Sequence, residues 1–188
     1  MPRMLWRSII PRVLKRTCVP SRRLSIQVQA TGAQTDIAEY FHFTKAVVAS
    51  RDCLSGNFAK FSLRHREPKE PINVEKAREQ HRNYVGELSK LIDHVVEVPA
   101  HKEFPDQVFV EDPAVVLDGV ALLTRMRSPS RAGEGTPMRA VLENLRLHVV
   151  EMKDPDAYLD GGDVIFTGRE FLVGLSRRTN KVNGFTCI

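Results

Sequence analysis

At 188 residues the chain is long enough for one or two domains. Its apolar and charged fractions, 42% and 27%, are typical of a globular protein, and no apolar run is long enough to span a bilayer. The net charge of +5 is unevenly spread. The first 35 residues carry seven bases and no acid, whereas the remainder carries 21 bases against 23 acids. This balance argues against nucleic-acid binding by the body of the protein.

The basic segment 1–35 is rich in arginine and interrupted by prolines, and its apolar residues would share one face of a short helix. A basic, amphipathic, acid-free start is typical of a mitochondrial transit peptide. The alternatives are a basic tail on a cytoplasmic protein or an upstream start codon. We therefore divide the chain into an N-terminal arm, 1–35, and one folded domain, 36–188.

In the first half of the domain the residue pattern predicts a strand, a loop, a helix and a second strand. The run FTKAVVA, 43–49, has strand composition, and 50–72 reads as a loop with at most a short helix. Apolar residues at three- and four-residue steps predict an amphipathic helix over 74–94. His81 lies on its apolar stripe, where a packed histidine is a better interpretation than a ligand. HVVEVPA, 94–100, predicts a strand.

The second half predicts a similar series. The stretch 108–126 reads as a strand, a break at Asp112-Pro113 and a hairpin turning at Asp118-Gly119. A helix is predicted over 136–146, with Thr136 as the N-cap and Pro137 at the first helical position. The strand LHVVEM follows, and then a hairpin that turns at 167–170.

A helix, a strand, a charged linker, an acid cluster and a hairpin therefore occur twice from Val74 onward. Such repetition predicts an α/β fold of stacked, pseudosymmetric units of αββ type. Acids precede apolar strands and bases follow them in both copies. If these strand ends converge, carboxylates and arginines would line a cavity suited to a zwitterion with a cationic side chain. Solvated strand-end charges are the alternative.

Three motifs taken together are more specific: FPDQVFVEDPAVV, SPSR and LDGGDVIFTGREFLVGLSRRTN. In this order and spacing they resemble the dimethylarginine dimethylaminohydrolase family over roughly residues 44–184, which correspond to about the first half of a family member. The resemblance implies an incomplete five-bladed α/β-propeller. It also implies that residues 36–188 form only part of such a domain.

The resemblance assigns substrate-binding roles to five residues. Asp112, with Glu111 beside it, would bind the substrate guanidinium, and Asp106 would contact the substrate amino group. Arg131 and Arg178 would hold the substrate carboxylate. The implied ligand is a methylated arginine, and the implied reaction yields citrulline and methylamines, which links the family to nitric oxide regulation.

In the family a cysteine thiolate attacks the guanidinium carbon and a histidine acts as general acid and base, with no metal or organic cofactor. Asp160 matches the acid that orients this histidine. The sequence has no histidine after His148, and Cys187 does not match the nucleophile's position. The three cysteines are Cys18, Cys53 and Cys187, and none belongs to a CxxC or Cys/His motif. The sequence therefore gives no support for a metal site.

We therefore expect this chain to be inactive alone and poorly stable, because an incomplete propeller exposes strand edges. One alternative is a methylarginine-binding or regulatory fragment without turnover. Another is a relative of arginine deiminases or amidinotransferases.

Overall fold

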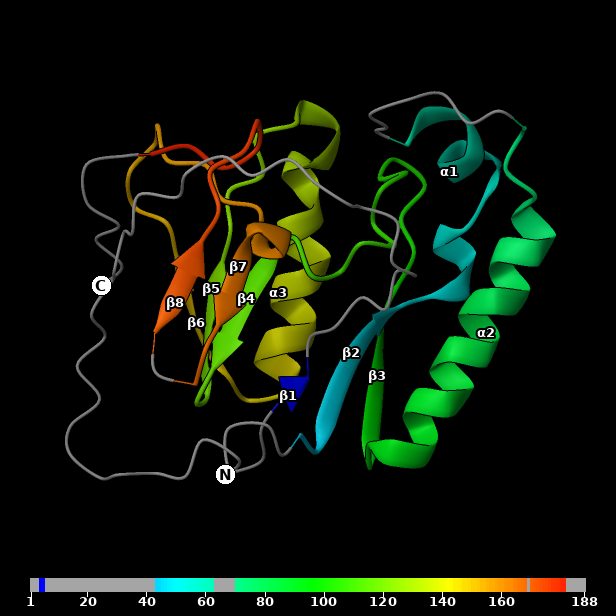
Figure 1. The fold of residues 1–188 in the computed structure, drawn as a ribbon, viewed down its shortest axis with the longest axis horizontal. Coiled ribbons are helices and arrows are strands. Elements are labelled where there is room, and N and C mark those ends of the chain that lie inside the picture. The colour runs from blue at the N-terminus through cyan, green and yellow to red at the C-terminus, as the bar shows by residue number, and fades with distance from the viewer. Residues whose placement is uncertain (1–3, 6–42, 63–69, 169, 182–188) are drawn as a thin grey trace.

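The computed structural model describes residues 4–5, 43–62, 70–168 and 170–181 (Figure 1). Most of the predicted transit segment, together with Cys18 and Cys187, lies outside these ranges. Helices alternate with small sheets, so the predicted α/β class is confirmed. In the described part of the chain, no helix is both long and apolar enough to cross a bilayer.

The first sheet joins three parallel strands in the order β1 (Met4–Leu5), β2 (Lys45–Ala49) and β3 (His94–Val98). The chain leaves β2 through the 3-10 helix η2 (Arg51–Cys53) and the short helix α1 (Gly56–Phe61), and returns through α2 (Val74–Leu91). Leu88 and Ile92 are buried against Ala46 and Val48 of the sheet. Leu91 of the same helix is 80% exposed.

Helix α2 ends three residues earlier than predicted. The Asn73 side chain caps its start by accepting a hydrogen bond from the Lys76 N–H. At its end Ile92 is already extended, because the chain must turn directly into β3 at His94.

The second sheet has the order β4 (Ala114–Leu117), β5 (Val120–Leu123) and β6 (His148–Glu151). The predicted turn at Asp118-Gly119 joins β4 and β5, and both residues have positive φ, 47° and 83°. Two consecutive left-handed residues match the right-handed twist of a tight hairpin. The 3-10 helix η3 (Pro129–Glu134) and helix α3 (Gly135–Asn144) then lead to β6, parallel to β5.

Two predictions in this region are wrong. Residues 108–111 form turns and not a strand. The backbone here makes a series of hydrogen bonds from an N–H to the carbonyl three residues earlier: Gln107 to Phe104, Phe109 to Asp106 and Asp112 to Phe109. Thr136 is not the N-cap: α3 continues directly from η3, with Glu134 at the cap position and no side-chain cap. Pro137 is consequently the third helical residue and not the first.

The third sheet is the antiparallel hairpin of β7 (Val164–Phe166) and β8 (Phe171–Val173), as predicted. Its turn is closed by Thr167, whose backbone N–H and hydroxyl both donate to the Glu170 carbonyl. The predicted series of a helix, a strand and a hairpin occurs twice, as α2-β3-β4-β5 and α3-β6-β7-β8. In each copy the strand belongs to one sheet and the hairpin after it to the next sheet. Each helix joins two parallel strands of one sheet, as β2-α2-β3 and β5-α3-β6 show.

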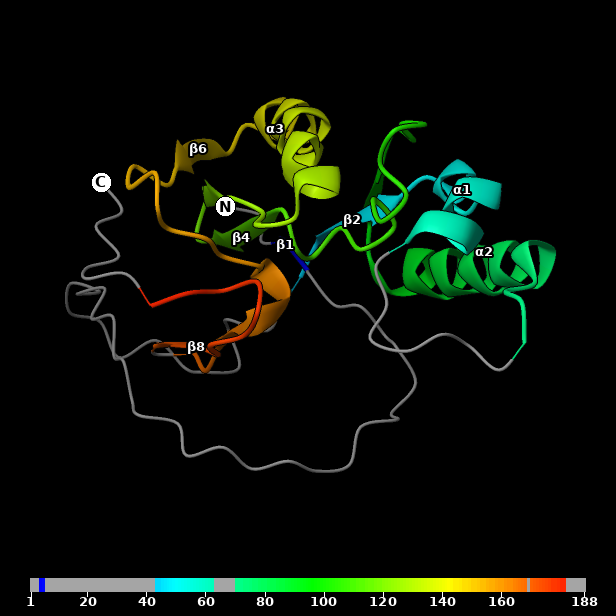
Figure 2. The same ribbon diagram turned by 90° about the horizontal axis from the view of Figure 1, so that it is seen from above.

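The elements form successive layers. Helix α3 packs between the first two sheets, where Met138, Val141 and Leu142 meet Val47 and Val98 on one side and β4 and β5 on the other. The opposite face of the second sheet, through Val115 and Leu122, packs with the third sheet. Figure 2 shows α3 and β8 on opposite sides of β4. Because the sheets are stacked, the loops at the strand ends of neighbouring sheets lie close to one another.

Candidate ligand-binding site

The LDGGD segment lies directly against the FVED segment. The Gly161 N–H donates to the Asp112 carbonyl at 2.8 Å, and the Gly162 N–H donates to Asp112 Oδ1 at 3.2 Å. A Cβ on Gly161 would lie 2.1 Å from the Glu111 carbonyl oxygen, and one on Gly162 would lie 2.6 Å from Asp112 Oδ1. Both glycines are therefore required by close approach of two chain segments.

Arg131 of the SPSR motif is buried beneath the same segment, with a side chain only 1% exposed. Its Nη1 donates to Asp112 Oδ2 at 2.5 Å, and its Nε and Nη2 form a fork on Glu134 at 2.9 and 2.7 Å. Its Nη2 also lies 3.3 Å from the carbonyls of Asp106 and Phe109. Burial lowers the pKa of this guanidinium, but Glu134 and Asp112 outweigh it and the net direction is upward. Arg131 therefore stays positively charged, and its charge is balanced by the carboxylates of Glu134 and Asp112.

Asp160 is buried against Asp112 and near Arg178. Its carboxylate Oδ2 lies 3.0 Å from Arg178 Nε, yet neither of its oxygens accepts an aligned hydrogen bond from the described residues. The contact with Arg178 is thus an ion pair without good hydrogen-bond geometry. Burial raises the pKa of Asp160 to about 8, with a further rise from Asp112 that Arg178 and Arg131 only partly oppose. Two adjacent buried acids favour one shared proton.

Arg178 is presented by a loop that the LDGGD segment holds in place. Asp163 Oδ2 accepts hydrogen bonds from the hydroxyls of Ser176 and Thr179, both at 2.6 Å. Thr179 Oγ1 in turn accepts from the Asp160 N–H at 3.0 Å. LDGGD and SRRTN are therefore one interlocked structure, from which the Arg178 side chain extends 45% exposed.

The structure thus joins four of the six predicted site residues in one cluster: Asp112, Arg131, Asp160 and Arg178. Asp106 is 1% exposed and meets Arg131 through its carbonyl. The charge of Glu111 contributes, after burial, to raising the pKa of Tyr84 on α2. Arg131 differs most from its predicted role, because its guanidinium is enclosed by protein groups where a ligand carboxylate was predicted to bind.

Sequence reasoning missed Glu134 and the bracing roles of Asp163 and Thr179. The signals were available: Glu134 follows Arg131 at three residues, the spacing of an ion pair on a helical turn. Asp163 and Thr179 stand inside the quoted motifs, but only their folded proximity gives them a function.

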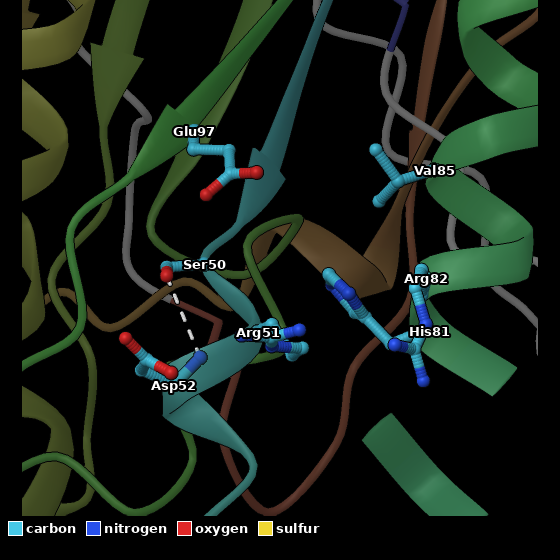
Figure 3. A pocket seen from close by; sticks show the side chains of 7 residues that line it. All are labelled: Ser50, Arg51, Asp52, His81, Arg82, Val85 and Glu97. Carbon is cyan, nitrogen blue, oxygen red and sulfur yellow. Dashed lines mark hydrogen bonds between the residues drawn. The ribbon is translucent and has the colours of Figure 1, made fainter. Parts of the chain in front are cut away.

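A separate hollow of about 300 Å³ opens between α2 and the carboxyl ends of β2 and β3 (Figure 3). It is lined by side chains of both signs, with His81 among them. Burial lowers the pKa of His81, which fits a neutral, packed histidine at neutral pH. Among the described residues, no cluster of three metal-ligating side chains occurs. Burial raises the pKa of the Cys53 thiol to about 12, so this sulfur is not a nucleophile.

The charge state of Asp160 gives a pH prediction. Because its folded pKa of about 8 exceeds the unfolded value, the folded state binds the extra proton and loses stability as pH rises from about 4 to 8. The loss is at most about 1.4 kcal/mol per pH unit. We expect Asp160→Asn to remove this slope, as measured by urea midpoints at pH 5 and pH 8. Equal slopes in both proteins would show that Asp160 titrates normally.

The chain is an α/β protein with a buried cluster of acids and arginines, and solved structures share its fold. The N-terminal domain of a cyanobacterial arginine dihydrolase superposes with a TM-score of 0.60 over 72% of this chain and 50% of that domain, at 22% identity, which shows the shared fold. The dimethylarginine dimethylaminohydrolase of Pseudomonas aeruginosa, solved with citrulline, superposes with a TM-score of 0.67 at 26% identity, over 74% of this chain and 53% of its own.

The sequence points to the same family. The chain is 42% identical over 110 residues to a DDAH2 protein of Bos taurus, covering 58% of this chain and 39% of that one. It is 33% identical over 105 residues to the Pseudomonas aeruginosa dimethylarginine dimethylaminohydrolase, covering 56% and 41%. No family model matches the chain. The predicted resemblance is confirmed: this chain is related to dimethylarginine dimethylaminohydrolases, and it spans about two fifths of the length of the curated relatives it matches.

Proposed function

We propose that this chain is the substrate-positioning part of a dimethylargininase-type amidinohydrolase. The observation that carries the proposal is Asp160, a buried carboxylate beside Asp112 whose oxygens accept no hydrogen bond from the described residues. Buried acceptors are normally satisfied, so such a group is poised for a donor that arrives with a ligand or another segment. The resemblance implies a histidine of a further segment as that donor, which Asp160 would orient, while Asp112 beside it is proposed to bind the substrate guanidinium.

The remaining groups suit the amino-acid end of the same ligand. Arg178 is partly exposed on a loop that Asp163 braces through Ser176 and Thr179, so its side chain can fork onto a carboxylate once it leaves Asp160. Asp106 is the acid proposed to face the ammonium group, and Glu111 is proposed to lie beside Asp112 at the guanidinium. Arg131 acts on the ligand through Asp112, since its guanidinium is enclosed.

Turnover requires groups beyond the positioning cluster. In the proposed reaction a thiolate displaces dimethylamine from the guanidinium carbon, and water then releases citrulline while a histidine transfers protons. Cys53 is too buried and too weakly acidic for this role. We propose that the remaining blades of a five-bladed propeller supply the nucleophile and the histidine, and that the chain alone binds without turnover. Mitochondrial import remains a proposal based on residues 1–35.

Calorimetric titration of the chain with asymmetric dimethylarginine tests this proposal. We expect saturable binding without citrulline formation. Arg178→Ala should weaken binding about 10-fold or more, as the loss of one charge-assisted bond predicts. Arg177→Ala is the matched control, because Arg177 is exposed and adjacent, and it should leave the affinity unchanged. Equal effects of the two substitutions, or no binding at all, would contradict the proposed function.

A further inference from the structure

Asn180 is the last residue of the SRRTN segment, and its carboxamide is hydrogen-bonded at both ends. Its Oδ1 accepts from the Tyr158 N–H at 2.8 Å, and its Nδ2 donates to the Asp156 carbonyl at 2.8 Å. The Asn180 N–H donates in addition to the Tyr158 carbonyl at 3.2 Å. Because one side chain satisfies backbone groups on a segment 22 residues away, it fixes that segment relative to its own.

Arg127, in the segment that follows β5, adds a second tie to the same loop. Its Nη1 donates to the Arg177 carbonyl at 3.1 Å, and its guanidinium carbon lies 5.8 Å from the centre of the Tyr158 ring. The Arg178 N–H donates to the Ser176 hydroxyl at 2.9 Å. The backbone around Arg178 is therefore held by hydrogen bonds on both sides, while its side chain stays 45% exposed.

These hydrogen bonds connect Arg178 with the acids of the cluster. The segment that Asn180 binds, 156–158, continues directly into the LDGGD backbone, which carries Asp160 and donates to the Asp112 carbonyl at 2.8 Å. Asn180 itself lies two residues after Arg178. A continuous hydrogen-bonded path therefore joins the backbone of Arg178 to Asp112.

We propose that Asn180 is a positioning residue of the ligand site, which holds the backbone of Arg178 at a fixed separation from Asp112 and Asp160. A ligand carboxylate is then bound by rotation of the Arg178 side chain on a backbone that stays in place. A fixed separation makes the site selective for ligand length, because the two ends of a ligand must reach both anchors at once. The ligand part rests on the proposed function, whereas the positioning part does not.

Asn180→Ala tests the proposal, with the titration of Asp160 as the readout. The charged groups that act on Asp160 are Asp112 before β4, Arg131 on η3 and Arg178 after β8, and Arg178 lowers its pKa. When the carboxamide is removed and the Arg178 loop is released, we expect carbon NMR to show Asp160 titrating at higher pH, by roughly one unit.

Asn73→Ala is the matched control. The Asn73 side chain also accepts from a backbone N–H, that of Lys76 at 2.9 Å, but it caps α2 and does not belong to the ligand cluster. Loss of this cap should lower the melting temperature and leave the Asp160 midpoint unchanged. If Asn180→Ala behaves in the same way, Asn180 has a packing role alone and the proposal is overturned.

Asn180→Gln serves if the alanine variant does not fold, because it keeps the carboxamide and displaces it by one methylene. The Asp160 midpoint should rise in this variant too, and an unmoved midpoint would equally overturn the proposal.

Ligand length separates the proposal from the proposed function. We expect the wild-type chain to bind asymmetric dimethylarginine about 10-fold more tightly than the homologue with one more side-chain methylene, and Asn180→Ala to reduce this preference. Equal wild-type affinities for the two ligands would contradict the fixed separation. Should the wild-type chain bind neither ligand while the Asp160 midpoint still moves in the variant, the proposed function fails and the positioning role stands. Binding with an unmoved midpoint would give the reverse conclusion.

Discussion

Arg131→Met is expected to destabilise the fold by about 3–5 kcal/mol, because removing one partner of a buried ion pair leaves the other charges uncompensated. The stranded groups are Glu134 and Asp112, which are 1% and 11% exposed in their side chains. The carbonyls of Asp106 and Phe109 also lose a donor. Urea denaturation at pH 7 measures the change.

Arg139→Met is the matched control for that prediction. Arg139 is also paired with two acids, Glu143 and Glu151, but all three side chains are at least a third exposed. Surface pairs of this kind contribute about 1 kcal/mol or less. Equal losses for the two arginines would show that the Arg131 cluster is solvated and not a buried anchor.

Gly161→Ala is expected to destabilise the chain by about 3 kcal/mol, because the new methyl group meets backbone and not a movable side chain. Its Cβ would lie 2.1 Å from the Glu111 carbonyl and close to those of Ala114 and Asp112. Relief requires separating LDGGD from FVED, which would break the bond from the Gly161 N–H to the Asp112 carbonyl. We also expect this variant to lose ligand binding.

Gly86→Ala provides the comparison. Gly86 lies within α2, is exposed, and a Cβ there would meet nothing within 4 Å. Alanine in place of an unhindered helical glycine should stabilise by about 0.5–1 kcal/mol. Thermal melts of the two variants should therefore move in opposite directions, and a neutral Gly161→Ala would contradict the packed contact between the motifs.

Local patterns predicted the elements that depend on neighbouring residues. The Asp118-Gly119 turn follows from two residues that tolerate positive φ, and β2, β3 and β6 follow from their β-branched runs. The failures depend on distant contacts. VFVE has strand composition, yet its Phe109 carbonyl accepts from the Asp112 N–H within a turn and from Arg131, 22 residues further along the chain, and not from a neighbouring strand.

At the candidate site, too, the sequence predicted which residues are involved but not the contacts that depend on distant parts of the chain. The motifs identified which residues gather, and the structure places Asp112, Arg131, Asp160 and Arg178 together. Sequence could not show that Arg131 is enclosed, because this depends on Glu134 lying in the same buried fork. Nor could it show that the oxygens of Asp160 accept no aligned hydrogen bond from the described residues and only lie in an ion pair with Arg178. That arrangement depends on the packed loop held by Asp163 and Thr179.

The central claim is that Asp160 and Arg178 form one ligand-responsive pair. The most direct measurement follows the Asp160 carboxyl carbon and the Arg178 Nε–H by NMR while asymmetric dimethylarginine is added to the chain. The account predicts that both signals move together and saturate at one ligand concentration, as the guanidinium binds at Asp112 beside Asp160 and the ligand carboxylate draws Arg178 away from Asp160. If both signals stay unchanged through saturating ligand, the cluster is a structural ion pair and the proposed site is wrong.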